Sequence, residues 1–355
     1  MAEILRLHHP DTASAPPTYA AAVDRYLVGA GISTNSARVY RIALTTWSWL
    51  LAGQQPPPGR ARRGAIPPAV DLAVLDDPAT AHTLMAAFAA RLAAGTDADT
   101  ANRELSILRA ALSWWRSQGW IHADPTLGLQ RRPAPADRTR ALTRDQVVAL
   151  FALQTMPGLP PAVGGKPRRV KVALRERTYW RLLYETAARA EEILNLNIGD
   201  LDLPNKRARV TSKGGQVEWV HYESGAAALL PRLLAGRAHP HSPVFLTDRK
   251  APPRTPRLDV CPVTGRARLS YRRAAELFER ATAQLDPEEV GWTLHQLRHS
   301  LLTHEAEAGT STPMLLAISR HASVRSLERY ARPGPEAVAR HVAERDPAAR
   351  RRRTR

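Results

Sequence analysis

The 355-residue sequence has almost no cysteine and no long apolar run. Its one cysteine, Cys261, excludes an internal disulfide framework and any metal site built from several cysteines. No apolar run is long enough to span a bilayer, and the first 17 residues lack the basic flank and apolar core of a secretory signal. These absences predict a soluble, cytoplasmic protein with no segment in a membrane.

Positive charge, by contrast, is abundant and unevenly placed. The formal net charge is +18, yet residues 1–130 hold 11 arginines, no lysine and 10 acidic residues, a net charge of only +1. Residues 131–355 therefore carry a net charge of +17. This distribution indicates a polyanionic partner, with nucleic acid favoured over an acidic membrane. A genome rich in arginine codons gives the same bias, so charge alone does not decide the function.

The first part of the chain has the pattern of a small helical domain. After a loose tail at residues 1–16, apolar residues at helical spacing predict four helices within 17–121. The segment 122–140 carries four basic residues and several loop-forming ones, which indicates an interdomain linker. Such a linker can lie along DNA phosphates, or it can be a solvated tether.

The second part, 141–335, mixes helical patterns with a short β pattern. A helical pattern extends over 170–187 and alternation over 207–222 breaks at a Gly-Gly pair, as in a β-hairpin. Helical patterns resume at 224–235 and 270–284. The expected fold class is therefore mainly α with a small antiparallel β-sheet.

The most specific pattern lies in the stretch 293–330. His295 and Arg298 are three residues apart, which places both on one face of a helix. His321 follows the arginine by 23 residues, and Tyr330 comes nine residues later. A single histidine or tyrosine is usually an ordinary core or surface residue, but this ordered spacing of four residues is far more specific.

Within this stretch, HQLRHSLLTH resembles the H-x-x-R-H motif of the tyrosine recombinases, the phage integrase family, and SRHASVRSLERY resembles their histidine-to-tyrosine motif. Upstream, YETAARAEEILNLNIGDLDL is similar to the segment with that family's first arginine, and VTSKGGQ to its lysine-bearing hairpin. The residues that match the family's catalytic set, in its order, are Arg189, Lys213, His295, Arg298, His321 and Tyr330. Glu192 matches its acidic position.

The chain departs from the family where two glycines are usual. It has AAR at 187–189 where the family has Gly-Leu-Arg, and SRH at 319–321 where the family has Leu-Gly-His. No catalytic side chain is lost. Alanine and arginine adopt left-handed backbone angles less readily than glycine does, so the resemblance alone does not give the backbone conformation near Arg189 and His321. Arg320 also adds a charge beside the site.

The resemblance implies that Tyr330 attacks a DNA phosphate, leaving a 3′-phosphotyrosyl link and a free 5′-hydroxyl. A phenol has a pKa of about 10, so the attack needs a proton acceptor, for which His295 is the candidate. Arg189 and Arg298 can each grip nonbridging oxygens and neutralise charge in the transition state. His321 can donate a hydrogen bond to the phosphate. The phosphotyrosyl link conserves the energy of the cleaved phosphodiester bond, so no metal and no other cofactor is expected.

The lysine and the carboxylate each have alternatives in the sequence. Lys213 can protonate the departing 5′-oxygen, although Lys171 and Lys206 are alternatives. Glu192 can support the first arginine with its charge, and it lies almost one helical turn from that arginine, whereas its neighbour Glu191 does not.

The resemblance thus implies a helical core-binding domain at 17–121 and a catalytic domain at 141–335. Its expected activity is site-specific recombination of double-stranded DNA, through a Holliday junction and a tetramer on two DNA sites. The basic tail 336–355 can dock on a neighbouring protomer or stay solvated. The alternatives are a type IB topoisomerase and a non-catalytic DNA-binding protein. A metal-dependent nuclease is disfavoured, because the carboxylates form no spaced trio.

Overall fold

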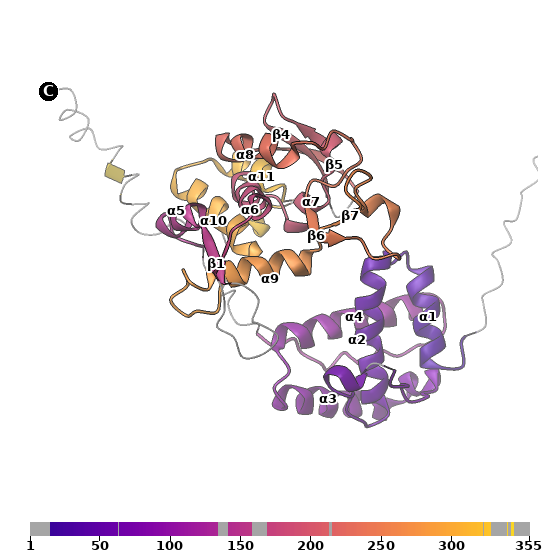
Figure 1. Ribbon diagram of the computed structural model, residues 1–355. Helices are drawn as coiled ribbons and strands as arrows, with labels where there is room; N and C mark the ends of the chain where they lie inside the picture. Colours follow the sequence, from indigo (N-terminus) through magenta and orange to yellow (C-terminus); the bar gives the residue numbers. More distant parts are fainter. Residues whose placement is uncertain are drawn as a thin grey trace, which may run out of the picture. The chain divides into compact units, whose positions relative to one another are not determined.

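The computed structural model describes residues 15–62, 64–133, 141–157, 169–212, 215–321, 323–327, 339 and 342–343. The chain forms two compact units, Met1–Arg138 and Thr139–Arg355 (Figure 1). Each has its own hydrophobic core. Within the described ranges, no helix combines the length and the apolar character needed to cross a membrane.

All the elements in the described part of the N-terminal unit are helices. Its elements are α1 (Tyr19–Gly29), α2 (Thr34–Leu51), η1 (Gly59–Arg62), η2 (Leu72–Asp76), α3 (Pro78–Ala93) and α4 (Ala98–Ser117). The four α-helices begin where the sequence offers a polar cap: each of Thr18, Ser33, Asp77 and Asp97 accepts a hydrogen bond from an amide of the first turn. The four predicted helices are therefore present.

Three buried aromatic side chains hold α1, α2 and α4 together. Trp47 donates its indole N–H to the carbonyl of Glu104 at 3.1 Å, and Trp115 donates to that of Ala22 at 3.2 Å. Tyr19 donates its hydroxyl to the carbonyl of Leu44, also at 3.1 Å. Each ring is buried with its polar atom satisfied, so it contributes apolar contact without the cost of an unpaired donor.

The segment predicted as a linker, 122–140, remains attached to this unit over its described part. Asp76 accepts hydrogen bonds from two consecutive amides at the start of the segment, each at 2.7 Å. Arg109 of α4 donates to the carbonyls of Thr126 and Leu129, at 2.9 and 2.5 Å, and Leu129 is buried. This part is not a solvated tether; the last seven residues of the segment lie outside the described ranges.

The C-terminal unit is mainly helical with short strands (Figure 1). Its elements are α5 (Arg144–Ala152), β1 (Thr155–Pro157), β2 (Arg169–Lys171), α6 (Leu174–Thr186), α7 (Ala190–Leu194), η3 (Ile198–Asp200), β3 (Leu201–Asp202), β4 (Arg207–Thr211), β5 (Val217–His221), α8 (Ser224–Leu234), β6 (Leu246–Lys250), η4 (Arg257–Asp259), β7 (Arg266–Arg268), α9 (Tyr271–Thr282), α10 (Leu294–Glu307), α11 (Thr312–Ser319) and η5 (Val324–Ser326). Helix α6 is central: it packs against α8, α9 and α10, and buries Tyr179 and Trp180.

The described strands form three small antiparallel sheets, with the orders β1-β2, β3-β4-β5 and β6-β7. The fold class is thus confirmed as mainly α, with more than the one small sheet expected. The predicted helix over 170–187 begins too early. Val170 pairs with Met156 in a β-ladder, and α6 starts only at Leu174. The predicted hairpin is correct, with Val210 opposite Glu218.

Candidate active site

Helix α10 presents the H-x-x-R pair as the sequence predicts. Its start is fixed by a capping box, in which Gln296 accepts a hydrogen bond from the Thr293 amide at 2.7 Å. His295 in the first turn is exposed, whereas Arg298, one turn later, is only 3% exposed. One helix therefore offers an imidazole at the surface and a guanidinium beneath it.

The buried guanidinium of Arg298 joins the ends of two other helices. It donates to the carbonyl of Ala187, which ends α6, and to that of Ser319, at 2.6 Å, which ends α11. The same NH2 group lies 3.3 Å from Nε2 of His321. Arg298 thus satisfies helix-end carbonyls that have no partner within their own helices, and it fixes His321 beside itself.

Both helix ends adopt the left-handed conformation that glycine favours. Ala187 has φ 48° and ψ 22°, and Arg320 has φ 55° and ψ 40°. These are the two positions where the resemblance led us to expect glycine. A side chain in this region costs on the order of 1 kcal/mol relative to glycine. The backbone therefore keeps the glycine geometry although the residues have changed, and this geometry directs the two helix ends toward Arg298.

Arg189 and Glu192 are paired across the first turn of α7. The backbone amide of Arg189 donates to Glu192 at 2.8 Å, and its NH1 group donates to the other carboxylate oxygen at 2.9 Å. The Arg189 side chain is 44% exposed, whereas that of Glu192 is 5% exposed. Burial by itself raises the pKa of Glu192, but hydrogen bonds from Arg320 and Arg189 outweigh it and lower the pKa. Glu192 is therefore ionised and holds Arg189 at the surface.

His321 is surrounded by positive charge. A guanidinium only donates, so Nε2 of a neutral His321 accepts from Arg298, and Nδ1 carries the proton. Burial, and then the charges of Arg298, Arg189, His295 and Arg320, lower the pKa of His321 to about 4. At neutral pH this imidazole is uncharged, with Nδ1–H as its donor.

This depressed pKa predicts an acid-sensitive stability of the free protein. In the unfolded chain a histidine has a pKa of about 6.5, so between pH 6.5 and 4 the unfolded state binds the proton first. The stability associated with neutral His321 is full above this window and is lost as the pH falls through it. Urea unfolding should show wild type losing on the order of 1 kcal/mol more than His321→Asn across the window. Parallel curves for the two proteins would contradict the depressed pKa.

The structure brings together four of the predicted site residues and the supporting carboxylate: Arg189, His295, Arg298, His321 and Glu192. Lys213 and Tyr330 lie outside the described residues. The strands that flank Lys213 in the sequence, β4 and β5, form the expected hairpin. The alternative Lys171 lies on β2, and Lys206 precedes β4.

One residue of this cluster was only partly anticipated from the sequence. Arg320 was expected to add a charge beside the site, but its side chain is 5% exposed and contacts Glu192. Nothing local in the sequence indicates this contact, because the two residues are 128 positions apart. The one available signal was a charged residue at a position where glycine was expected.

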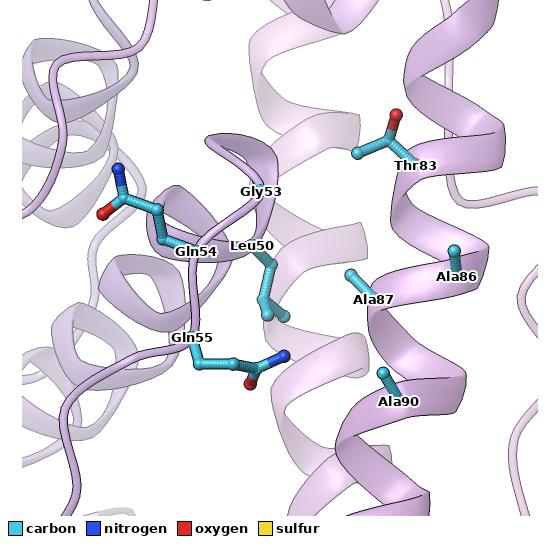
Figure 2. A pocket seen from close by; sticks show the side chains of 8 residues that line it. All are labelled: Leu50, Gly53, Gln54, Gln55, Thr83, Ala86, Ala87 and Ala90. Atoms are coloured by element: carbon cyan, nitrogen blue, oxygen red, sulfur yellow. The ribbon is translucent and has the colours of Figure 1, made fainter.

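A cavity on the N-terminal unit does not belong to this site. It has a volume of about 420 Å³ and lies between the end of α2 and helix α3 (Figure 2). Its lining consists of Leu50, Gly53, Gln54, Gln55, Thr83, Ala86, Ala87 and Ala90. None of these side chains can act as an acid, a base or a phosphate-binding cation, so the cavity offers no catalytic chemistry.

The chain resembles known proteins in both sequence and fold. Residues 142–336 match the Phage integrase family. The chain is 29% identical over 265 residues to the tyrosine recombinase XerC of Mycobacterium sp. (strain KMS), covering 74% of this chain and 80% of that protein. Its fold resembles the Tn1549 transposon integrase in complex with a circular intermediate DNA (TM-score 0.62, 16% identity, 93% of this chain and 99% of that one). It also resembles a lambda integrase dimer bound to a COC′ core site (TM-score 0.59, 17% identity, 88% and 77%).

The family match covers more than half of the chain and includes every residue of the cluster. The similarity to XerC extends beyond that range, and the fold similarity covers both units. The chain therefore belongs to the phage integrase family, and it is a tyrosine-type site-specific recombinase that binds, cleaves and rejoins DNA.

Proposed function

We propose that Tyr330 attacks a DNA phosphate to give a 3′-phosphotyrosyl link and a free 5′-hydroxyl, and that strand exchange passes through a Holliday junction. The observation that carries this proposal is the gathering of Arg189, His295, Arg298 and His321 at one place. His295 and Arg298 come from α10, His321 follows the end of α11, and Arg189 precedes the first residue of α7. This set of cations and imidazoles suits transfer of a phosphoryl group to a hydroxyl nucleophile. Cleavage conserves the phosphodiester energy in the tyrosyl link, and attack by the 5′-hydroxyl rejoins the strand.

The two arginines have different environments and, we infer, different tasks. Arg189 is partly exposed and held by Glu192, so its guanidinium can grip two nonbridging oxygens of an incoming phosphate. Arg298 is buried and tied to two carbonyls, so it supplies fixed positive charge that needs no reorganisation during the reaction. Together they can neutralise the charge that grows on a pentacoordinate phosphorus.

Proton transfers fall to the remaining residues. His295 is exposed at the start of α10 and can accept the phenolic proton of Tyr330. Neutral His321 can donate its N–H to a phosphate oxygen once its ring turns, because Nδ1 is enclosed among the described residues. Lys213, between β4 and β5 in the sequence, can protonate the departing 5′-oxygen. Glu192 acts through Arg189 and is a supporting residue.

The wider organisation follows from the same proposal. Residues 17–121 would bind the core DNA site, 122–140 would link the units, and 141–335 would carry out catalysis in the cytoplasm on nucleoid DNA. Four protomers would assemble on two DNA sites, with the tail 336–355 docking on a neighbour. In the lambda integrase structure a dimer is bound to a core site, which supports assembly on DNA.

A suicide duplex with a nick beside the cleavage position tests the chemistry. Wild type should become covalently attached to the 3′-phosphate, and the released strand should carry a 5′-hydroxyl. Two such sites on separate plasmids should then yield recombinants and a resolvable junction. Sequence-independent relaxation of supercoils with turnover, and no recombinants, would favour the topoisomerase alternative.

The hairpin β6–β7 carries a separate group of cations that we expect to contact DNA phosphates. Five exposed cations lie on its strands and connecting loop: Arg249, Lys250, Arg254, Arg257 and Arg266. None has an ion-pair partner in the part of the chain that the structure describes. Lys250 and Arg266 even lie directly opposite each other in the ladder, a like-charge pair that costs free energy in the absence of an anion.

Replacing Lys250 and Arg266 by glutamine should therefore weaken DNA binding and flatten its salt dependence. If both contact phosphates, the slope of log K against log salt should fall by about 2. Cleavage at saturating protein should be unchanged, because among the described residues no hydrogen bond or ion pair joins Lys250 or Arg266 to the proposed catalytic residues. The matched control removes two charges from the surfaces of α8 and α9, by Arg232→Gln and Arg272→Gln. Equal slope changes in both double variants would contradict a specific contact.

A further inference from the structure

Arg320 is an arginine at a backbone position that suits glycine. It ends α11 with φ 55°, where a glycine or asparagine would end the helix with less strain. Its side chain nevertheless turns into the unit and is only 5% exposed. A long charged side chain that is both strained and buried needs compensation from its surroundings.

Two carboxylates supply that compensation. The NH2 group of Arg320 donates to Oε2 of Glu192, and its NH1 group lies 3.7 Å from Oε2 of Glu218. The Nε and NH1 atoms of Arg320 have no hydrogen-bond acceptor among the described residues. The buried guanidinium is therefore stabilised mainly by the charges of these two carboxylates.

Each carboxylate belongs to a different part of the active site. Glu192 lies in the first turn of α7 and holds Arg189. Glu218 lies on β5, opposite Val210 of β4, in the hairpin whose strands flank Lys213 in the sequence. Arg320 itself directly precedes His321 in the chain. Its guanidinium thus connects three chain segments that each contribute one catalytic candidate.

We propose that Arg320 is a positioning residue, which fixes Arg189 and the β4–β5 hairpin relative to His321. This inference depends on the proposed function, because it assigns Arg320 a task in the same phosphate site. Without Arg320, Glu192 would have Arg189 as its remaining cationic partner, and would draw that guanidinium away from the phosphate. The hairpin would lose its contact to the end of α11.

The proposal assigns no contact with DNA to Arg320. Its side chain is too deeply buried to reach a phosphate, and its spare N–H groups are enclosed. Its effect should therefore appear in the rate of cleavage of bound DNA, and not in the affinity for DNA. A residue that only stabilised the fold would alter the melting temperature without altering this rate.

Arg320→Gly is the decisive variant, because glycine relieves the backbone strain while it removes both ion pairs. Single-turnover cleavage of the suicide duplex at saturating protein should fall by about 10-fold or more, as for a lost electrostatic contact in a catalytic site. The affinity for uncleaved duplex should change by less than about twofold, since each surface contact to DNA is retained. Arg320→Lys should recover part of the rate. Glu289→Gly relieves the same kind of strain, at φ 57° on the surface, and should leave cleavage unchanged.

The coupling to the hairpin is tested with Glu218→Gln. If Arg320 acts through Glu218, then adding Glu218→Gln to Arg320→Gly should cost no further rate, whereas independent effects would multiply. Hydrogen exchange gives a readout that does not require chemistry: amides of β4 and β5 should exchange faster in Arg320→Gly and Glu218→Gln than in wild type.

Equal cleavage rates and equal hairpin exchange in wild type and Arg320→Gly would overturn the proposal. If Arg320→Gly does not fold, Arg320→Lys and Glu218→Gln give the same two readouts. Absence of an adduct with wild type would contradict the proposed function instead, and hydrogen exchange would still decide whether Arg320 positions the hairpin.

Discussion

Tyr330→Phe should form no covalent adduct with the suicide duplex, whereas wild type should form one. The substitution removes one oxygen atom, and that atom is the proposed nucleophile, so the loss should reach the detection limit of the assay, about 10⁴-fold or more. Binding of uncleaved DNA should be retained, because the phenol contributes little to phosphate contacts. The measurement is denaturing electrophoresis of labelled duplex, with electrophoretic mobility shift for binding.

Tyr271→Phe is the matched control for this experiment. Tyr271 starts α9, its side chain is exposed, and it lies outside the proposed site. The Tyr271→Phe variant should form the adduct at the wild-type rate. An adduct that persists in Tyr330→Phe, and maps by peptide analysis to another residue, would replace Tyr330 as the nucleophile and would require a different reading of the stretch 293–330.

Arg298→Ala should lose both activity and stability. The cleavage rate should fall by about 10²–10³ or more, because a fixed cation that stabilises the transition state is removed. The carbonyls of Ala187 and Ser319 would lose a buried donor, which costs about 1–3 kcal/mol each, so the melting temperature should also fall. Both quantities are measurable, by single-turnover cleavage and by thermal unfolding.

Two further variants separate the charge of Arg298 from its geometry. Arg298→Lys keeps the charge, but an ammonium lacks the planar fork that reaches both carbonyls, so stability should recover more than activity does. Arg189→Ala removes the other arginine, which is partly exposed and does not join helix ends. It should lower the cleavage rate strongly with little change in melting temperature. Equal thermal losses in both alanine variants would contradict the distinct tasks proposed for the two arginines.

Helix starts were predictable because their signals are local. Thr143 with Gln146, and Thr293 with Gln296, form capping boxes, each written within four consecutive residues. The hairpin over 207–222 was predictable for a similar reason, since alternation and a Gly-Gly turn occupy one continuous stretch. The H-x-x-R spacing likewise fixed which helix face carries His295.

The errors concern short elements whose partners are not neighbours in sequence. Val170 carries the same local pattern as the helix that follows, but its pairing with Met156 makes it part of a strand. The strands β6 and β7 were not predicted at all. Each is short, β7 has only three residues, and a long loop separates them, so neither alternation nor a tight turn signals the pair.

The sequence by itself determined which groups are available for the chemistry: the proposed nucleophile, the cations, and the helix face that presents His295 and Arg298. Tertiary structure alone decided what each group does there. It buried Arg298 against two helix-end carbonyls, lowered the pKa of His321 by burying it and placing cations around it, and directed Arg320 onto Glu192, 128 residues away. The physical reason is the separation in sequence over which each effect acts. Helix caps and apolar periodicity act over a few residues. Burial and the field of neighbouring charges depend on packing between segments that are distant in sequence.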